Sequence, residues 1–179
     1  EYNLRVIEMN QVLNHDWKDL ENRKALITAQ EIQNQPKVWM KLACVLESRK
    51  QELGTFMNKV LGIPGLRVIF TGAGSSAFVG ESLMMLLGQE KGLRSETHHT
   101  TDIVATPDAI FEDMPTLLVS YSRSGSSPES CAAIQIAQKH VKQLYNLVLV
   151  CNSDSALARL PMDSEMTKIV HIPQEACDQ

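Results

Sequence analysis

The residues most able to do chemistry are serines that follow an apolar run in the middle of the chain. Ser122, Ser124 and Ser127 lie directly after the run at 116–121, and Pro128 follows them. Proline is favoured at the first position of a helix and serine just before it, so we expect a strand to pass through these serines into a helix. Hydroxyls and the unpaired amides of a helix start both suit an anion. The pattern therefore predicts a phosphate-binding loop.

A second junction of the same kind lies upstream. The apolar run at 67–71 leads into Gly74, Ser75 and Ser76 before an expected helix. Ligands of parallel sheets bind at the carboxyl ends of the strands, so we expect both loops to contact one phosphorylated ligand. A single serine would not indicate a phosphate site, because serine is common at turns and helix starts, where its hydroxyl bonds to the neighbouring backbone. Hydroxyls gathered at two strand ends favour a polar ligand, since a packed core gains nothing from them.

The first junction also fits a dinucleotide-binding fingerprint, Gly72-Ala-Gly74-Ser-Ser-Ala77. Such a site needs an acidic residue at the end of the next strand, about 20 residues on. That position holds His98 and His99, and Asp102 comes only in the loop beyond. A dinucleotide-dependent oxidoreductase is therefore a weaker interpretation, and it leaves the second serine cluster without a function. A nucleophile elbow is excluded because serines replace the glycines that should flank Ser124, and no Walker sequence is present.

Composition excludes several classes of protein. The chain has 179 residues, 44% of them hydrophobic, which is enough for one domain with a full core. Its net charge of −4 argues against a nucleic-acid partner. No run of apolar residues is long enough to span a membrane, and we expect a cytoplasmic protein. The widely spaced cysteines fit neither a zinc site nor a redox motif, and we interpret them as reduced thiols: Cys44, Cys131, Cys151 and Cys177.

The elements that must position these loops can be predicted from periodicity. Between residues 16 and 60, apolar residues recur at helical spacing, and we expect Pro36 to begin a second helix that ends near Gly62. Beyond residue 64, short apolar runs alternate with helical segments, as in a parallel sheet covered on both faces. Strands are expected at 67–71, 95–99, 116–122, 146–152 and 168–172. Helices are expected at 77–89 and 128–142, a short turn at 155–160 and only a helical turn within 102–113.

These elements predict an α/β fold, a three-layer sandwich with a five-stranded parallel sheet and right-handed crossovers, preceded by N-terminal helices. We expect a helical segment at 1–62 and the α/β domain at 63–179. Both serine junctions then fall at the carboxyl ends of strands.

Four motifs together resemble those of the SIS (sugar isomerase) domain family. They are Gly-Ala-Gly-Ser-Ser at 72–76, Ser-x-Ser-Gly-x-Ser at 122–127, Cys-Asn-Ser-Asp-Ser at 151–155 and Pro-Gln-Glu at 173–175. The resemblance spans residues 65–179 and implies a flavodoxin-like fold. Gln-Pro-x-Val-Trp at 35–39 and the ending Pro-Gln-Glu-Ala-Cys-Asp-Gln are more narrowly similar to AgaS-type proteins. Those proteins are tagatose-6-phosphate ketose/aldose isomerases or galactosamine-6-phosphate deaminases.

The resemblance implies that a hexose or hexosamine 6-phosphate binds through residues of both loops. The implied phosphate-binding residues are Gly74, Ser75, Ser76, Ser122, Arg123, Ser124 and Ser127. Arg123 stands where amidotransferase relatives carry glutamine, so it either caps the phosphate or faces solvent. Glu175 matches a glutamate that lines the sugar pocket of those relatives, and we take it as the catalytic candidate.

Isomerisation or deamination would need proton transfer between C1 and C2 of the opened sugar, hence a carboxylate or an imidazole near the carbon acid. The candidates by position are Glu175, Asp178, His98, His99 and Glu81. His98 and His99 alternate across a strand end, so at most one faces the pocket, and we expect a surface role for both. We interpret Cys177 as an inert thiol. The histidines and acids lack metal-ligand spacing, so neither a metal nor another cofactor is expected.

Resembling proteins continue into a second SIS domain that supplies the principal acid/base residue, whereas this chain ends at Gln179. We therefore expect it to bind a sugar phosphate with negligible turnover by itself. A non-catalytic sugar-phosphate sensor is the alternative function, and the oxidoreductase is the third. Residues 84–87 form an apolar run that one helix face cannot hide, which predicts a homo-oligomer.

Overall fold

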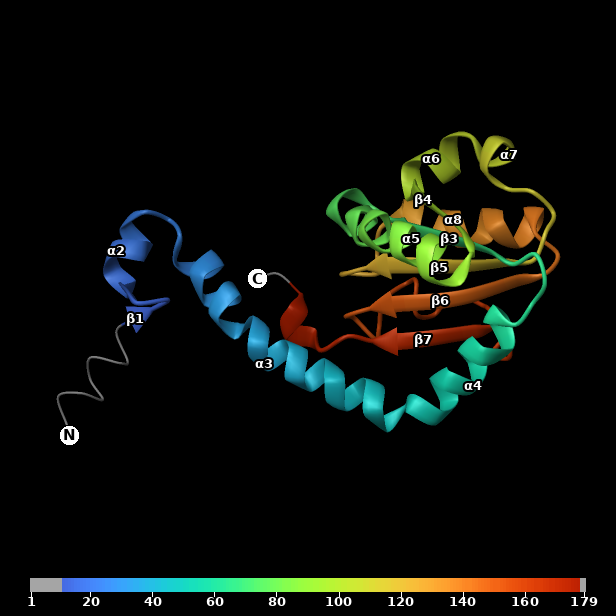
Figure 1. Ribbon diagram of the computed structural model, residues 1–179. Helices are drawn as coiled ribbons and strands as arrows, with labels where there is room; N and C mark the ends of the chain where they lie inside the picture. The colour runs from blue at the N-terminus through green and yellow to red at the C-terminus, as the bar shows by residue number, and fades with distance from the viewer. Residues whose placement is uncertain (1–10, 178–179) are drawn as a thin grey trace.

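The computed structural model describes residues 11–177, except for the side chains of residues 89–91. A parallel sheet forms its centre, and helices cover both faces (Figure 1). The strands of this sheet are β3 (Arg67–Gly72), β4 (Arg94–His99), β5 (Thr116–Ser122), β6 (Leu144–Val150) and β7 (Thr167–His171). The strands β1 (Gln11–Val12) and β2 (His15–Asp16) form a small antiparallel hairpin before it.

The helices expected at 77–89 and 128–142 are present with changed boundaries, and the described chain holds more helices than the sequence predicts. Its α-helices are α2 (Trp17–Asn22), α3 (Leu26–Ser48), α4 (Lys50–Leu61), α5 (Ala77–Lys91), α6 (Thr100–Ala105), α7 (Pro107–Ile110) and α8 (Pro128–His140). Two short 3-10 helices are η1 (Gly74–Ser76) and η2 (Gln174–Ala176). Residues 155–160 form turns, as expected. The segment 102–113 holds more than the single helical turn expected there, because most of α6 and all of α7 fall within it.

The sheet has the strand order β4-β3-β5-β6-β7, and every pair in it is parallel. The predicted three-layer α/β fold with a five-stranded parallel sheet is therefore confirmed. In the register, Gly72 lies opposite His99 on one side and Tyr121 on the other. The carboxyl ends of three adjacent strands consequently lie level with one another at one edge.

Alternate strand residues pack into two cores, one on each face of the sheet. On one face Ile69, Leu118 and Val148 pack with Ile103 of α6 and Ile134 of α8. All five of these side chains are fully buried. These aliphatic contacts fix α8, and hence the loop before it, against the sheet.

The opposite face of the sheet is covered by α4 and α5. Phe70 and Val119 of the strands pack with Phe56 and Val60 of α4, and the half-buried Met84 of α5 joins them. At Gly80 of α5 an added Cβ would collide with the Phe70 side chain, so this helix lies unusually close to β3. Such close packing holds the start of α5 against the end of β3.

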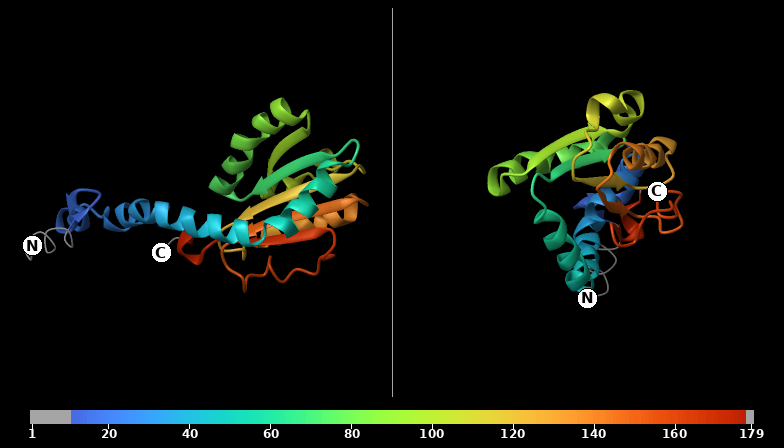
Figure 2. Two further views of the ribbon diagram at one scale, coloured as in Figure 1. Left: turned by 60° about the horizontal axis from the view of Figure 1, so that its bottom comes forward. Right: turned by 90° about the vertical axis from the view of Figure 1, so that its right-hand side faces the viewer.

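Pro36 lies inside α3, so the expected helix start at this residue is wrong. The break falls instead at Arg49, between α3 and α4. Proline removes one helical hydrogen bond, which is tolerated here because Ala29 is the buried residue of α3 and the rest of this helix is accessible to water. Figure 2 shows α3 extending away from the sheet with α2 and the hairpin at its far end.

A buried ion cluster ties β3 to β4 at the amino ends of the strands. The Arg67 side chain, 2% exposed, donates to the Ile110 carbonyl at 2.6 Å and to Glu96 Oε2 at 2.5 Å. Burial would raise the pKa of Glu96, but hydrogen bonds from Arg67, His98 and Arg94 outweigh it and lower that pKa to about 2. This cluster lies at the opposite edge from the serine junctions, so we assign it to stability.

Candidate phosphate-binding site

The topology places both serine junctions at the point where the strand order reverses. In chain order the strands run second, first, third, fourth and fifth across the sheet. The connection after β3 leads to α5 on one face, and the connection after β5 leads to α8 on the other. Where adjacent connections leave to opposite faces, a crevice opens beyond the carboxyl ends of the strands. This is the usual ligand position in a doubly wound sheet.

A cavity of about 350 Å³ lies at this point. We call the segment 73–76 the first serine loop, the segment 122–127 the second serine loop and the space between them the serine cavity. The lining residues are Ala73, Ser75, Ser76, Val79, Tyr121, Ser122, Arg123, Ser124 and Ser127. The structure thus brings together residues expected from both junctions. Gly74 belongs to the same first loop.

Glycines shape the first serine loop. A Cβ on Gly72 would lie 2.8 Å from the backbone and side chain of Ser76, so only glycine lets the loop fold back this closely. Gly74 has a φ of +55°, in the left-handed region. The loop then passes through η1 into α5, and Ser75 and Ser76 at this helix start face the cavity. The positive end of the helix dipole is consequently directed at the same space.

The second serine loop is held by its own hydroxyls. Ser122 Oγ accepts a hydrogen bond from the Gly125 amide at 3.0 Å, and Ser124 Oγ accepts one from the Ser126 amide at 3.3 Å. Gly125 has a φ of +63°, and its carbonyl accepts from the Leu157 amide at 2.9 Å. A serine hydroxyl that accepts can still donate its own proton. Ser122 and Ser124 are therefore fixed in place and able to donate to a ligand.

The helix after the second loop begins where the sequence predicts. Ser127 is the N-cap of α8 in an extended conformation, and Pro128 is its first residue. The Ser127 hydroxyl makes no capping bond and pairs instead with Ser130 Oγ at 2.5 Å. Two helices of 15 and 13 residues, α5 and α8, thus present their N-termini at the serine cavity. Backbone amides at such ends favour an anion.

Sequence reasoning missed Tyr121, which also lines the cavity. Its ring stacks on Phe70 at a centroid distance of 6.3 Å. Burial raises the pKa of Tyr121 to about 12, so the phenol stays protonated and can donate a hydrogen bond. The alternation of Ser120, Tyr121 and Ser122 across the strand end was the available signal, because it places Tyr121 on the α5 face, where the first serine loop lies.

Glu175 lines a different hollow from the serine cavity. It lies in η2 and forms an ion pair with Lys41 of α3. The hydrogen bond from Lys41 lowers the pKa of Glu175, so this carboxyl group is ionised at neutral pH. The hollow beside it measures about 880 Å³ and is lined from α3, the β1–β2 hairpin and η2. Lys41 was not singled out from the sequence, since an ion pair across 134 residues leaves no local pattern.

The remaining candidate bases pair with neighbours near the sheet edge. His98 Nε2 lies 3.1 Å from Glu96, and His99 Nε2 lies 3.9 Å from Glu81 of α5. None of these four side chains lines the serine cavity, and both histidines are half-buried. Asp178 lies outside the described residues. Within residues 11–177, no cluster of three His, Cys, Asp or Glu side chains could hold a metal ion.

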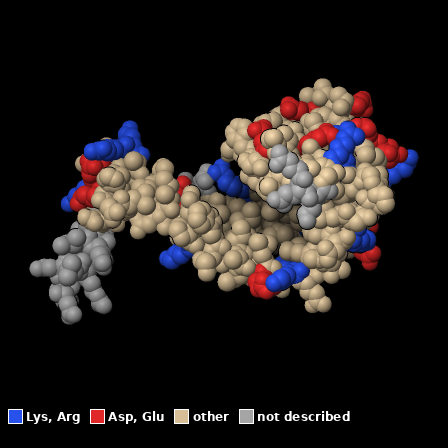
Figure 3. Space-filling view, in the orientation of Figure 1, with Lys and Arg blue, Asp and Glu red and all other residues tan. Residues whose placement is uncertain are grey.

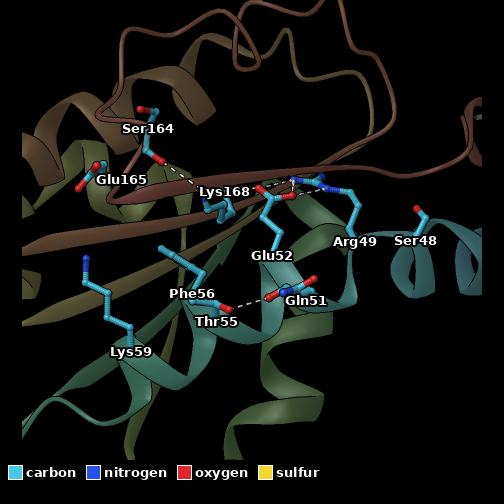
Figure 4. A pocket seen from close by; sticks show the side chains of 10 residues that line it. All are labelled: Ser48, Arg49, Gln51, Glu52, Thr55, Phe56, Lys59, Ser164, Glu165 and Lys168. Carbon is cyan, nitrogen blue, oxygen red and sulfur yellow. Dashed lines mark hydrogen bonds and ion pairs between the residues drawn. The ribbon is translucent and has the colours of Figure 1, made fainter.

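A further groove of about 770 Å³ lies between α4 and the segment that leads into β7 (Figure 4). Three of its charged side chains interact with one another. Arg49 forms a salt bridge of 2.9 Å with Glu52, and Lys168 lies 3.5 Å from the same carboxylate and over the Phe56 ring. These contacts attach α4 to the edge of the sheet. We assign the groove to packing.

On the side drawn in Figure 3, Lys and Arg side chains (blue) and Asp and Glu side chains (red) lie interspersed, and no large patch of one charge sign is seen. No helix of the described chain is long and apolar enough to cross a membrane.

Comparison with known proteins finds relatives of this chain. Residues 65–176 match the family model of the SIS domain. The D-galactosamine-6-phosphate deaminase AgaS of Shewanella sp. (strain ANA-3) is 38% identical over 158 residues, which cover 86% of this chain and 41% of that protein. The chain spans about 40% of the length of the curated relatives it matches.

Two solved structures are similar over most of the chain. The tagatose-6-phosphate ketose/aldose isomerase of Escherichia coli has a TM-score of 0.80 at 34% identity and covers 84% of this chain and 41% of that one. A candidate tagatose-6-phosphate ketose/aldose isomerase from Clostridium novyi NT has a TM-score of 0.84 at 38% identity, covering 94% of this chain and 43% of that one.

Proposed function

The chain belongs to the SIS domain family, and from this premise we propose that its serine cavity binds the phosphate of a hexose or hexosamine 6-phosphate. The whole protein would isomerise or deaminate that sugar. The relatives named above act on galactosamine 6-phosphate or tagatose 6-phosphate, which makes these sugars the first substrates to test. The observation that carries the proposal is the convergence of two serine loops at the switch point of the sheet.

Phosphate chemistry fits the groups that line the serine cavity. A phosphate dianion accepts several hydrogen bonds, and each charge-assisted bond contributes on the order of 1.5–3 kcal/mol. Ser76, Ser122 and Ser124 offer hydroxyls from two sides, and the α5 and α8 N-termini offer backbone amides. Arg123 also lines the cavity, and its guanidinium suits a phosphate oxygen. We propose Gly74, Ser75 and Ser127 as further contacts.

For catalysis we propose Glu175 as the base that moves the proton between C1 and C2. Its ion pair with Lys41 keeps it ionised, as a base requires. The η2 segment that carries it is joined to the second serine loop, because Cys177 Sγ donates to the Arg123 carbonyl at 3.7 Å. A sugar whose phosphate binds in the serine cavity would have to extend toward this segment to reach Glu175.

One observation favours a second candidate, a sugar-phosphate-binding module without turnover. The side chains that line the serine cavity in the described chain include no carboxylate and no imidazole. Measuring ammonia and ketose phosphate after adding galactosamine 6-phosphate separates the two candidates. Turnover by this chain that Glu175→Gln abolishes supports the enzyme with Glu175 as its base, whereas tight binding with no turnover by the whole protein supports the binding module.

Calorimetric titration of the purified chain tests the proposed ligand. Galactosamine 6-phosphate should bind, while galactosamine and NAD should give no binding at the same concentrations, because the phosphate monoester supplies the recognised charge. Equal affinity for the free sugar would contradict phosphate recognition. Preferential binding of NAD would favour the dinucleotide interpretation of Gly72 and Gly74 instead.

We also propose that the chain self-associates through α5. Met84 and Leu87 pack against the sheet, whereas Met85 and Leu86 on the same helix are 64% and 50% exposed. Phe78 at the start of α5 is 56% exposed as well. Sedimentation at micromolar concentration should show a dimer or larger species, and Met85→Glu should shift it to the monomer. A monomeric wild-type chain would exclude the idea.

A further inference from the structure

Two cysteines that are distant in sequence meet at one backbone carbonyl of the second serine loop. Cys151 follows β6, and its amide donates to the Arg123 carbonyl at 3.2 Å. Cys177 follows η2, and its thiol donates to the same carbonyl at 3.7 Å. Both residues thus contact one oxygen atom, and the Cys177 thiol lies near enough to the Cys151 thiol to raise its pKa. The 25 residues between them include β7, so the fold and not the local sequence brings them together.

The two thiols differ in access. Cys151 is 6% exposed, and its burial, together with the neighbouring Cys177 thiol, raises its pKa to about 11. Cys177 is half-buried at the molecular surface. It is joined to its own segment by a backbone hydrogen bond of 2.9 Å to Gln174. An oxidant therefore reaches Cys177 first, and Cys151 is the neighbouring thiol able to resolve the oxidised sulfur.

We propose that Cys151 and Cys177 form a peroxide-sensitive thiol pair that closes to a reversible disulfide beside the serine cavity. In the first step the Cys177 thiolate attacks hydrogen peroxide, which gives a sulfenic acid and releases hydroxide. In the second step the Cys151 sulfur attacks that sulfenic sulfur, which forms the S–S bond and releases water. Two equivalents of a small thiol return Cys151 and Cys177 to thiols by exchange and are themselves oxidised to a disulfide.

Closure would alter the second serine loop. The Cys177 thiol would lose its proton and with it the hydrogen bond to the Arg123 carbonyl, and residues 173–177, which include Glu175, would be tied covalently to the end of β6. The loop would keep the amide of Cys151 as a donor to that carbonyl. This coupling rests on the proposed function, and we expect oxidation to weaken binding of the sugar phosphate.

Peptide mapping tests the disulfide without reference to any ligand. The reduced chain is treated with hydrogen peroxide, alkylated and digested with trypsin. The expected product joins the peptide 143–159 to the peptide 169–179 with the loss of two hydrogen atoms. Dithiothreitol should release both peptides. Cys177→Ser should abolish the product, while Cys131→Ser, which removes another half-buried thiol, should leave it unchanged.

Two results would overturn the thiol pair. One is the absence of the joined peptide under conditions that oxidise the exposed Cys44. The other is joining of Cys177 to Cys44 or Cys131 in equal yield, which would indicate random pairing. Titration with galactosamine 6-phosphate before and after oxidation tests the coupling separately. The coupling is supported if oxidation lowers the affinity of the wild-type chain and leaves the affinity of Cys177→Ser unchanged. It is contradicted if a wild-type chain in which the disulfide between Cys151 and Cys177 has formed completely binds as tightly as the reduced chain.

Discussion

Replacing Gly125 by alanine probes what holds the second serine loop in place. Gly125 has a φ of +63°, a conformation that L residues rarely adopt. A Cβ at this position would lie 2.6 Å from Ser155 Cβ and 2.6 Å from Val150 Cγ2, with Ser155 Oγ closer still. These neighbours belong to the end of β6 and the turn after it. Either they or the loop must move.

The size of the effect follows from two contributions. The left-handed backbone costs an L residue about 1 kcal/mol, and forcing a methyl group into this packed site costs about 2 kcal/mol more. We therefore expect Gly125→Ala to lower the free energy of unfolding by about 3 kcal/mol, which for a chain of this size lowers the melting temperature by roughly 6–12 °C. Gly65 is the matched control, with a φ of +71° and no atom within 4 Å of an added Cβ. Gly65→Ala should cost only about 1 kcal/mol.

Urea unfolding followed by circular dichroism measures both variants. Gly125→Ala should also bind galactosamine 6-phosphate more weakly, because the carbonyl of residue 125 would move away from the Leu157 amide and displace the second serine loop. Gly65→Ala should bind as the wild type does. Equal losses of stability in the two variants would refute the argument that packing against Ser155 and Val150 fixes the loop.

Three further predictions concern single side chains. Tyr121→Phe keeps the aromatic ring, so the melting temperature should not change. Calorimetry should show sugar-phosphate binding weakened by about 1 kcal/mol, because the phenol no longer donates a hydrogen bond. Undiminished binding would exclude the phenol as a donor. A backbone carbonyl and Asp108 raise the pKa of His140, so its stabilisation should be complete below a pH of about 6.5 and disappear as the pH rises through the raised pKa. Melting curves of wild type and His140→Gln should therefore converge at high pH, and a constant gap would contradict this assignment. Arg67→Met leaves the Glu96 carboxylate without its buried partner and should lower the free energy of unfolding by about 3 kcal/mol in urea, whereas an unchanged value would show that Arg94 suffices.

Much of the fold follows from patterns that act within short segments. The apolar runs ending at Gly72 and Ser122 predict strands, and Pro128 marks a helix start, because each signal depends on residues a few positions apart. Pro36 misled the prediction for the same reason. Local preference places proline at a helix start, but a solvent-exposed helix tolerates the lost hydrogen bond.

Of the candidate site, only the residues that belong to a local sequence pattern could be predicted. The serines carry their signal in the loops themselves, and the structure brings them together. Tyr121 enters the cavity through the alternation of side chains at the end of β5, a local signal that the prediction did not use. The pairs Lys41–Glu175 and Cys151–Cys177 depend on how α3, β6 and η2 meet in space. The spacing of the cysteines in sequence carries no sign of the contacts that Cys151 and Cys177 share, because the tertiary structure makes them.

The most direct test of the central claim is the affinity of the serine cavity for galactosamine 6-phosphate after Ser122 and Ser124 are both replaced by alanine. Loss of two charge-assisted donors should weaken binding by roughly 3 kcal/mol, or about a hundredfold. Ser126→Ala is the control, because Ser126 lies in the same loop but does not line the cavity. Both serines also accept backbone hydrogen bonds, so melting curves must show that each variant is folded at the titration temperature. The account predicts a hundredfold loss for the double variant and none for the control; wild-type affinity in the folded double variant would contradict it.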